Sequence, residues 1–237
     1  MDLHCALSGI EIAMWDIVGK TVEQPIYNLI GGPVRPHIRV YANGWGQGSP
    51  DDKAQEAAEL VEQRGFNALK FDPFPGPWRE YPNRDELAEA ADTVGKVREA
   101  VGPHVELLIE VHRRLAPVHA ISAAKQMEKY NPYWFEEPCP PDNIDAILEV
   151  KNNTTIPVVT GEAHYTRNGF REIFDKRAVD IINPDICNTG GILELTQIAA
   201  MAQPHYIAVS PHGYNSTSVG CAAAVHASAT IPNFLIY

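Results

Sequence analysis

The sequence is short of cysteine, of basic residues and of long apolar runs. Its four cysteines form no Cys-x-x-Cys pair, which argues against a disulfide framework or a zinc site and favours a reducing cytoplasm. There are 19 Lys and Arg against 30 Asp and Glu, and the net charge of −11 argues against a nucleic-acid partner. No run approaches the roughly 18 apolar residues that span a bilayer, and no signal peptide is visible, so we expect a soluble protein without a membrane partner.

Short β-rich runs alternate with segments of helical periodicity along most of the chain. The expected strands lie at 38–43, 67–72, 105–110, 133–136, 157–161, 179–183, 206–210 and 233–237. The expected helices lie at 51–64, 84–101, 118–130, 144–150, 167–174, 191–202 and 218–229. Strict alternation predicts parallel strands, and eight of them favour an α/β protein of the (β/α) barrel type. A doubly wound open sheet is the competing fold, but residues 44–48 lack the spacing of the Gly-rich turn that should follow its first strand.

Residues 1–33 stand outside this alternation. The segment 7–20 carries apolar residues at helical spacing on one face, and Gly31-Gly32-Pro33 ends whatever follows it. We therefore divide the chain into residues 1–33 and a barrel domain at 34–237.

Acidic residues stand at the carboxyl ends of three successive expected strands. They are Glu110, either Glu136 or Glu137, and Glu162, and they are evenly spaced along the chain. Any one of them could merely cap the next helix. Three at the same height in a barrel would meet at the catalytic face, where their mutual repulsion requires a cation. A hard divalent ion suits oxygen ligands, and Mg²⁺ is the ion we predict.

Two histidines are candidates for proton transfer. His212 and Asp185 end neighbouring expected strands, so their side chains could pair, and a carboxylate on one ring nitrogen leaves the other to take a proton. His112 follows Glu110 by two residues, so both side chains point to the same side if the strand stays extended. His112 has no evident carboxylate partner of its own.

Three further side chains are candidates for substrate binding. Lys70 and Asp72 share one face of an expected strand, where Lys70 could hold an anionic substrate. His164 follows Glu162 by two residues. The alternatives are a solvated lysine at position 70 and a structural histidine at position 164.

Several runs of sequence, taken together, resemble the enolase superfamily. In family order they are Ser8 to Lys20, Leu29-Ile30-Gly31-Gly32, Leu69-Lys70-Phe71-Asp72-Pro73, Phe135-Glu136-Glu137-Pro138, Gly161-Glu162, Asn183-Pro184-Asp185 through Gly190-Gly191, and Ser210-Pro211-His212-Gly213. Within that superfamily the chain is similar to the mandelate racemase subgroup, and most similar to galactonate dehydratases, which remove water from sugar acids. The resemblance implies the (β/α)7β barrel of the superfamily.

The resemblance also implies a reaction and a ligand set. The reaction is abstraction of the proton next to a substrate carboxylate, through an enediolate, to give a 2-keto-3-deoxy sugar acid. The magnesium ligands would be Glu110, Glu136 and Glu162, with Glu136 preferred to Glu137 because the family's ligand is the first acid of a Glu-x-Pro signature.

The same resemblance implies the roles of the two histidines. His212 with Asp185 would be the base. His112 would be the acid that assists the departure of hydroxide.

Three features depart from that family. Glu110 stands where the family commonly has Asp, and Lys70-Phe71-Asp72 replaces a Lys-x-Lys pair, which favours dehydration over two-base racemisation. The chain also looks truncated at both ends. Residues 1–33 would then be a remnant of the junction between a capping domain and the barrel, with the catalytic barrel at 34–237.

Two alternatives to a galactonate-type enzyme stay open. Residues 111–117 resemble a segment of mannonate dehydratases, although Asp185 next to His212 is more like the galactonate type. A non-catalytic barrel fragment is the alternative from another class. For either enzyme the partner is a small sugar acid, and we expect a homo-oligomer because truncated ends expose strand edges and apolar surface.

Overall fold

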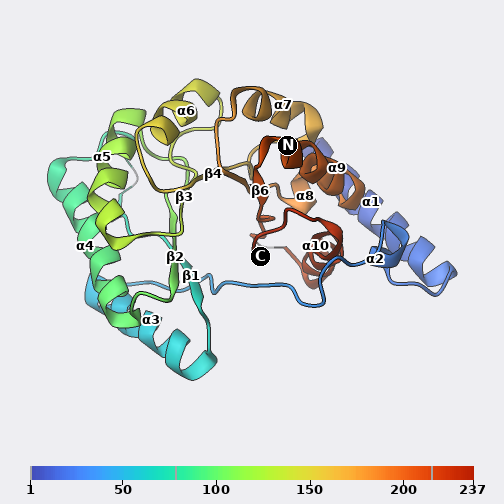
Figure 1. Cartoon of the computed structure of the whole chain (residues 1–237), viewed down its shortest axis with the longest axis horizontal. Helices are drawn as coiled ribbons and strands as arrows, with labels where there is room; N and C mark the ends of the chain where they lie inside the picture. Colours follow the sequence, from blue (N-terminus) through green and yellow to red (C-terminus); the bar gives the residue numbers. More distant parts are fainter. Residues whose placement is uncertain (1, 78, 215) are drawn as a thin grey trace. The chain divides into compact units, whose positions relative to one another are not determined.

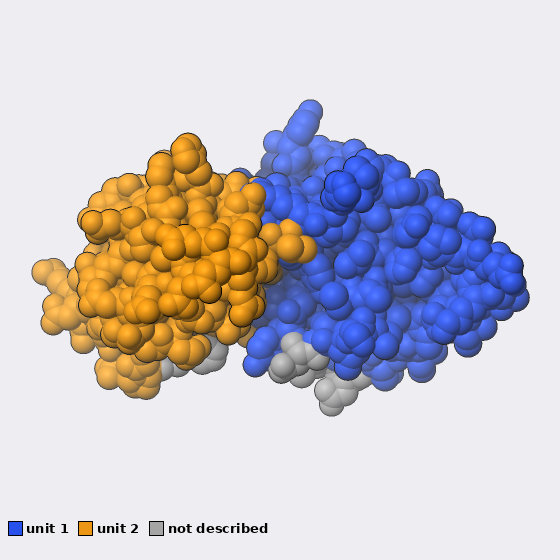
Figure 2. Space-filling model, turned by 90° about the horizontal axis from the view of Figure 1, so that it is seen from below, with its two compact units in different colours: residues 1–39, 160–237 blue, residues 40–159 orange. Residues whose placement is uncertain are grey.

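Two compact units make up the part of the chain that the structure describes. The computed structural model covers residues 2–77, 79–214 and 216–237. Unit 1 comprises Met1–Arg39 and Thr160–Tyr237, and unit 2 comprises Val40–Val159 (Figure 2). Unit 1 is therefore built from the two end segments of the chain, and unit 2 from its middle.

Unit 2 alternates helices with strands, and its strand ladders are parallel (Figure 1). In chain order its elements are α3 (Pro50–Arg64), β1 (Ala68–Phe71), α4 (Arg84–Val101), β2 (Glu106–Glu110), α5 (Pro117–Met127), the 3-10 helix η1 (Glu128–Tyr130), β3 (Trp134–Glu136), α6 (Ile144–Asn152) and β4 (Val158–Thr160). The last residue of β4, Thr160, belongs to unit 1. β1 pairs with β2, β2 with β3, and β3 with β4, so neighbours in the sheet are neighbours along the chain. The register sets Glu110 opposite Glu136.

Two-sided burial explains why these strands form. Every residue of β1 and β3 is buried, as is all of β2 except its first residue. Strands buried on both faces are typical of parallel sheets, because the crossover helices cover those faces. Two of the helices begin at capping boxes, Ser49 with Asp52 in α3 and Asn83 with Glu86 in α4.

Unit 1 carries the remaining helices and strands. They are α1 (Asp2–Thr21), α2 (Ile26–Leu29), α7 (Thr166–Lys176), β5 (Ile181–Ile182), α8 (Ile186–Thr189), α9 (Ile192–Ala202), the 3-10 helix η2 (Gln203–His205), β6 (Ala208–Val209) and α10 (Ser218–Thr230). β5 and β6 pair in parallel, and the N–H of Asn183 donates to the carbonyl of Thr160 at 3.2 Å. Among the described residues, no helix is both long and apolar enough to cross a membrane.

The predicted alternation of parallel strands and helices is confirmed, but the first and last expected strands are not. Within the described ranges, residues 38–43 and 233–237 form isolated bridges instead, Ala42 with Leu69 and Phe234 with Val209. Val40 is 47% exposed, so the first run lacks the two-sided burial that holds β1. The sequence pattern also misses α2 and α8, because four residues are too few to show helical periodicity.

Polar side chains of α1 fasten this helix to the start of α9. The hydroxyl of Ser8 accepts a hydrogen bond from the N–H of Gly190 at 3.0 Å. The Glu11 carboxylate accepts from the N–H groups of Ile192, at 2.7 Å, and Leu193, at 2.9 Å. The first turn of a helix carries unpaired donors and a partial positive charge, and a carboxylate satisfies both. Glu11 therefore caps a helix far away in the sequence.

We expect Glu11→Ala to lower the free energy of unfolding by about 1–2 kcal/mol, because α9 loses the acceptor at its N-terminus. Urea denaturation followed by circular dichroism measures this change. Glu62→Ala, at an exposed position of α3, is the control and should change stability by less than about 0.5 kcal/mol. Equal effects of the two substitutions would show that the cap contributes nothing.

Candidate active site

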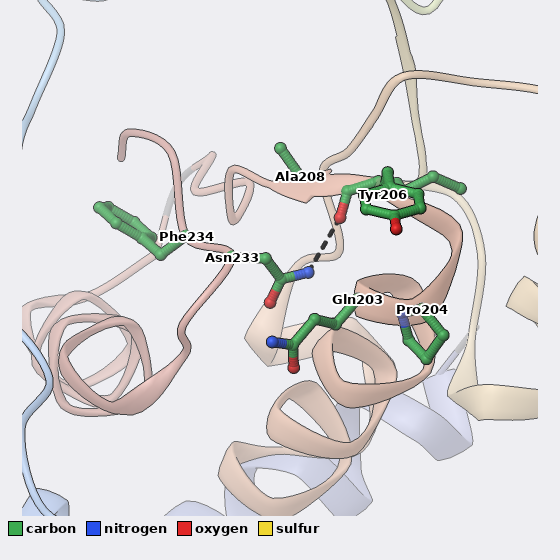
Figure 3. A pocket seen from close by; sticks show the side chains of 7 residues that line it. Gln203, Pro204, Tyr206, Ala208, Asn233 and Phe234 are labelled. Atoms are coloured by element: carbon green, nitrogen blue, oxygen red, sulfur yellow. Dashed lines mark hydrogen bonds between the residues drawn. The ribbon is translucent and has the colours of Figure 1, made fainter.

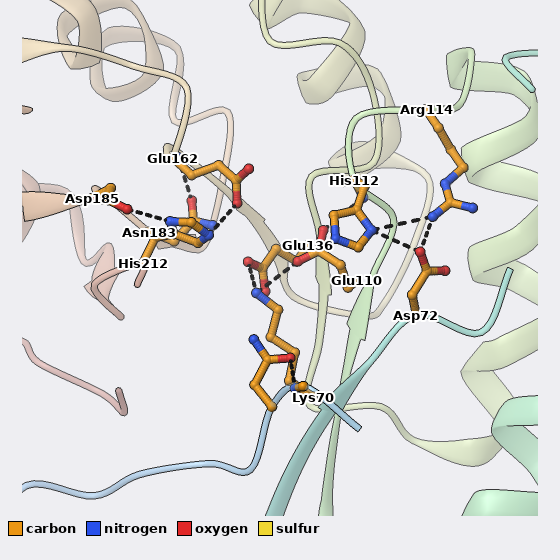
Figure 4. Close-up of polar contacts among 12 residues, drawn as sticks. Lys70, Asp72, Glu110, His112, Arg114, Glu136, Glu162, Asn183, Asp185 and His212 are labelled. Carbon is orange, nitrogen blue, oxygen red and sulfur yellow. Dashed lines mark hydrogen bonds and ion pairs between the residues drawn. The ribbon is translucent and has the colours of Figure 1, made fainter. Parts of the chain in front are cut away.

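Lys70 lies between two carboxylates in unit 2. Its Nζ is 2.8 Å from Oε2 of Glu110 and also pairs with Oε1 of Glu136 (Figure 4). None of the three side chains is more than 4% exposed. β1, β2 and β3 supply one charged residue each, and their parallel register brings these residues together. Lys70, predicted to bind substrate, is thus engaged by two of the predicted metal ligands.

Burial and pairing act in opposite directions on these charged groups. Burial by itself lowers the pKa of Lys70 and raises that of Glu110. The two carboxylates outweigh burial and raise the pKa of Lys70 well above its usual value. The ammonium of Lys70, together with His112, brings the pKa of Glu110 down to about 2. Burial raises the pKa of Tyr41, whose ring centre is 5.9 Å from Nζ of Lys70, to about 12.

Of the two adjacent acids at the end of β3, Glu136 is the one set opposite Glu110 and paired with Lys70. Glu137 follows the strand in a left-handed conformation, with φ of 48°, and is fully buried. Its carbonyl accepts a hydrogen bond from the N–H of Arg113 at 2.6 Å. The geometry of unit 2 agrees with the choice of Glu136, whose role as a metal ligand stays a prediction.

A second polar cluster in unit 2 joins Asp72, His112 and Arg114. Asp72 directly follows β1, and its Oδ2 lies 2.9 Å from Nδ1 of His112 and pairs with Nη2 of Arg114 (Figure 4). The expectation that His112 has no carboxylate partner is therefore wrong. Spacing could not reveal this pair, because its members are 40 residues apart and follow different strands. A substrate-binding role for Asp72 stays a prediction.

The chain turns sharply after β2, and this turn aims the ring of His112. His112 and Arg113 are both left-handed, with φ of 56° and 61°, so the strand does not stay extended as the same-side expectation required. Such conformations cost of order 1–3 kcal/mol for a non-glycine residue and persist only where the surroundings hold them. Here the N–H of His112 donates to Oε1 of Glu110 at 2.8 Å.

In unit 1, His212 stands between two carboxylates. Its Nδ1 is 2.8 Å from Oδ2 of Asp185, and its Nε2 is 3.1 Å from Oε2 of Glu162 (Figure 4). The expected contact between Asp185 and His212 is present, and a parallel bridge aligns their backbones. Oδ1 of Asp185 accepts from the N–H of Cys187 at 2.7 Å, so the N-cap of α8 fixes this carboxylate.

A tight turn after β4 places Glu162. Gly161 has φ of 149°, and a Cβ there would lie 3.0 Å from the ring of Phe170, so glycine is required. Oδ1 of Asn183 accepts from the N–H of Glu162 at 3.1 Å. His164 lies on the same turn, with its ring centre 5.7 Å from that of Phe170. Its predicted part in substrate binding is untested by these contacts and stays a prediction.

Two buried residues that contact predicted site residues are given no role in the sequence analysis. Arg114 pairs with Asp72, and Asn183 accepts a hydrogen bond from the N–H of Glu162. Arg114 is 7% exposed at its side chain, and Asn183 is 3% exposed. The sequence feature that points to them is a polar residue shortly after an apolar strand. Asn183 directly follows β5, and Arg114 lies in the turn after β2. Burial of such groups requires hydrogen-bond partners, which both have.

The chemistry of the three predicted ligands fits Mg²⁺. In unit 2, Glu110 and Glu136 are buried carboxylates that share the ammonium of Lys70. In unit 1, Glu162 contacts the ring of His212. Carboxylate oxygens are the ligands that Mg²⁺ prefers, and the donor set contains no soft ligand that would favour another metal.

Unit 1 also has a pocket. It surrounds the start of β6 and is lined by Gln203, Pro204, Tyr206, Ile207, Ala208, Asn233 and Phe234 (Figure 3). The side-chain amide of Asn233 donates to the carbonyl of Ile207 at 2.9 Å. His212 follows the other end of β6, so this pocket lies away from the predicted catalytic groups of its unit.

Two family models match the chain. The model described as "Enolase C-terminal domain-like" matches residues 52–237. The model of the mandelate racemase / muconate lactonizing enzyme N-terminal domain matches residues 1–31. Together these matches leave only residues 32–51 outside them.

Named relatives and a solved structure are similar over nearly the whole chain. The D-gluconate/D-galactonate dehydratase of Picrophilus torridus is 34% identical over 100% of this chain and 60% of its own length. The D-xylonate dehydratase of Haloferax volcanii is 36% identical over 97% of this chain and 58% of its own length. The crystal structure of a mandelate racemase/muconate lactonizing enzyme-like protein from a Roseovarius species superposes with a TM-score of 0.92 at 37% identity, over 98% of this chain and 61% of that one. The chain thus spans about three fifths of the length of these proteins.

We expect Lys70→Met to lower the free energy of unfolding by about 3–5 kcal/mol in metal-free buffer, because Glu110 and Glu136 would stay buried without their cation. Adding Glu136→Gln removes one uncompensated charge and should recover part of the loss. Lys96→Met, which removes the surface pair with Asp51, is the control and should have a much smaller effect. A double variant no more stable than Lys70→Met would contradict this account of the cluster.

Proposed function

The chain belongs to the enolase superfamily, in its mandelate racemase/muconate lactonizing enzyme group, and we propose that it acts as a Mg²⁺-dependent dehydratase of a sugar acid. The same matches confirm the predicted (β/α) barrel class. The observation that carries the proposal is the Asp185–His212 contact of 2.8 Å, because a carboxylate on one ring nitrogen makes a histidine a suitable general base. The names of two relatives supply the substrate class, since they specify gluconate, galactonate or xylonate.

Glu110, Glu136 and Glu162 would hold the metal ion. When bound, Mg²⁺ supplies positive charge against the substrate carboxylate, which stabilises the negative charge that develops after proton removal. The even spacing of the three residues along the sequence and the oxygen chemistry of their side chains support this assignment. Within unit 2, the register that sets Glu110 opposite Glu136 supports it further.

His212 would remove the proton next to the substrate carboxylate. Asp185 engages Nδ1, so Nε2, which lies 3.1 Å from Oε2 of the proposed metal ligand Glu162, is the nitrogen that would accept this proton. The electron pair of the broken C–H bond passes into an enediolate of the substrate. Because the N-cap of α8 fixes Asp185, the imidazole has a fixed orientation before substrate binds.

His112 would act in the second half of the reaction. In its protonated form it gives a proton to the oxygen of the 3-hydroxyl while the C3–O bond breaks, and that oxygen leaves as water. The electrons of the enediolate form the bond between C2 and C3. The resulting enol takes up a proton at C3 and becomes a 2-keto-3-deoxy sugar acid.

The surroundings of Lys70 support dehydration over racemisation. Two-base racemisation needs a second base facing the first, and the family's Lys-x-Lys pair reads Lys70-Phe71-Asp72 here. Lys70 is ion-paired with two glutamates, and Asp72 contacts His112. We place the reaction in the cytoplasm, where the four free cysteines suit a reducing environment.

Turnover and isotope exchange test the proposal together. We expect the chain, incubated with Mg²⁺ in D₂O, to convert at least one of D-galactonate, D-gluconate, D-xylonate and D-mannonate to its 2-keto-3-deoxy acid. His212→Asn should give neither product nor deuterium at C2 of recovered substrate. His112→Asn should give little product but measurable deuterium, because proton removal precedes loss of the hydroxyl. Mass spectrometry and NMR of the recovered acids provide both measurements.

Three results would change the proposal. Reversed behaviour of the two variants would exchange the roles of His212 and His112. Exchange that survives in both would point to another base, with Lys70 or His164 the next to examine. Mg²⁺ binding without turnover of any sugar acid would favour the non-catalytic barrel, and turnover of D-mannonate alone would favour the mannonate type.

We expect Glu136→Gln to abolish tight Mg²⁺ binding in isothermal titration calorimetry, because the site loses one anionic oxygen ligand. Glu137→Gln is the matched control at the neighbouring position and should bind Mg²⁺ like the parent. The opposite pattern would move the ligand assignment by one residue.

A further inference from the structure

A three-residue network in unit 2 controls the orientation of the His112 ring. We propose that Asp72 and Arg114 are positioning residues for His112: they hold its Nδ1 and thereby make Nε2 the nitrogen that transfers the proton. The part of this proposal that concerns proton transfer rests on the proposed dehydratase function. The part that concerns the tautomer of His112 stands on the contacts alone.

Asp72 is itself held in place. Its Oδ1 accepts a hydrogen bond from the N–H of Phe74 at 2.9 Å, and its backbone carbonyl accepts from Nζ of Lys53 at 2.9 Å. These contacts fix both the carboxylate and the main chain that carries it. Oδ2 is thereby directed to Nδ1 of His112, at 2.9 Å (Figure 4).

Arg114 fixes the same carboxylate oxygen. Its Nε donates to the carbonyl of Val111 at 2.8 Å, and its guanidinium carbon lies 5.3 Å from the centre of the Phe74 ring. The side chain is only 7% exposed. A planar guanidinium anchored in this way presents its remaining donors in one direction, and Nη2 meets Oδ2 of Asp72.

Both Asp72 and Arg114 approach Nδ1 of His112, and their distances decide between them. Oδ2 of Asp72 is 2.9 Å away, whereas Nη2 of Arg114 is 3.4 Å away. The first distance is typical of a hydrogen bond, and the second is beyond the usual range. Nδ1 therefore carries the hydrogen and donates it to Asp72. Because Nδ1 keeps its hydrogen against Asp72, Nε2 is the nitrogen that takes up the additional proton of the imidazolium and gives it away.

This network suggests a role for Asp72, at a position where the sequence differs from the family's pattern. Asp72 stands at the second position of the family's Lys-x-Lys pair, and here it contacts the proposed acid instead of serving as a base. The His112 side chain is 41% exposed, so it would rotate among several rotamers if nothing held it. An acid held in one orientation loses less entropy on the way to the transition state.

The tautomer of His112 can be measured without turnover. In protein labelled with ¹⁵N-histidine and loaded with Mg²⁺, long-range ¹H–¹⁵N spectra show which ring nitrogen carries the hydrogen, and His112→Asn identifies the signals. At a pH at which the ring is neutral, we expect the Nδ1–H tautomer in the parent and a mixture in Asp72→Ala. Arg114→Met should shift the populations in the same direction, and Arg114→Lys should restore part of the parent state. Arg79→Met, which removes a more exposed pair with Glu86, is the control and should leave the spectra unchanged.

The kinetic test separates positioning from a merely structural role. We expect Asp72→Ala to lower product formation about 10- to 100-fold, as loss of an outer partner of an active-site histidine commonly does. Deuterium exchange at C2 and KM should change only a few-fold, because His212 acts before His112. A structural defect in unit 2 would instead lower product formation and exchange in the same proportion.

The outcomes distinguish this proposal from the proposed function. An unchanged His112 tautomer in Asp72→Ala overturns the positioning role, whether or not the chain turns over a sugar acid. A changed tautomer in a chain whose parent shows no turnover supports positioning and overturns the dehydratase function. Equal losses of product and exchange overturn the part played in proton transfer. If Asp72→Ala does not fold, the spectra of Arg114→Met decide the question by the same criterion.

Discussion

Carboxylates remain charged inside unit 2 because Lys70 is buried with them. Glu110 and Glu136 each end a strand whose other core residues are apolar, so neither could stay ionised there without a cation. The three charges are therefore mutually dependent, and the parallel register of β1, β2 and β3 is what brings them within reach. In unit 1, the ring of His212 contacts both Asp185 and Glu162.

The two histidines share a design but differ in how their carboxylates are anchored. Each has a carboxylate oxygen within 2.9 Å of Nδ1. Both carboxylates accept a hydrogen bond from a backbone N–H two residues further on, and Asp72 is in addition paired with the guanidinium of Arg114. A backbone N–H carries no net charge, whereas the guanidinium of Arg114 is positively charged. It therefore balances the negative charge of Asp72 without any contribution from His112. The two histidine–carboxylate pairs thus differ in the charge of the groups around the carboxylate.

Local patterns were sufficient to predict the alternation and the strand ends, because both depend on neighbours in the sequence. Capping residues such as Ser49 and Asn83 mark helix starts, and acids directly after apolar runs mark the ends of β2 and β3. The choice of Glu136 over Glu137 agrees with the observed contacts, although its role as a ligand is still a prediction. The strand expected at 38–43 was wrong, because burial on both faces is a property of the whole fold.

The environment of His112 shows where such reasoning ends. The alternation of side chains along an extended strand does not continue past Glu110, because His112 and Arg113, in the turn after β2, are left-handed. The side to which His112 points therefore cannot be predicted from its spacing to Glu110. The partner that this turn brings to the ring, Asp72, is distant in the sequence. Only the folded structure joins the two, and Arg114, which completes the network, has no sequence signal apart from its place after a strand.

The discontinuity of unit 1 has a consequence for folding on the ribosome. α1 emerges early, but the N–H groups that Glu11 caps lie 181 and 182 residues later. All of unit 2 has been synthesised once Val159 has emerged, so its contacts can form first. Domains generally fold as units during synthesis, and the residues of unit 2 are all present before those of unit 1. Throughout that interval the nascent chain carries α1 without α9, the helix to which it will be fastened.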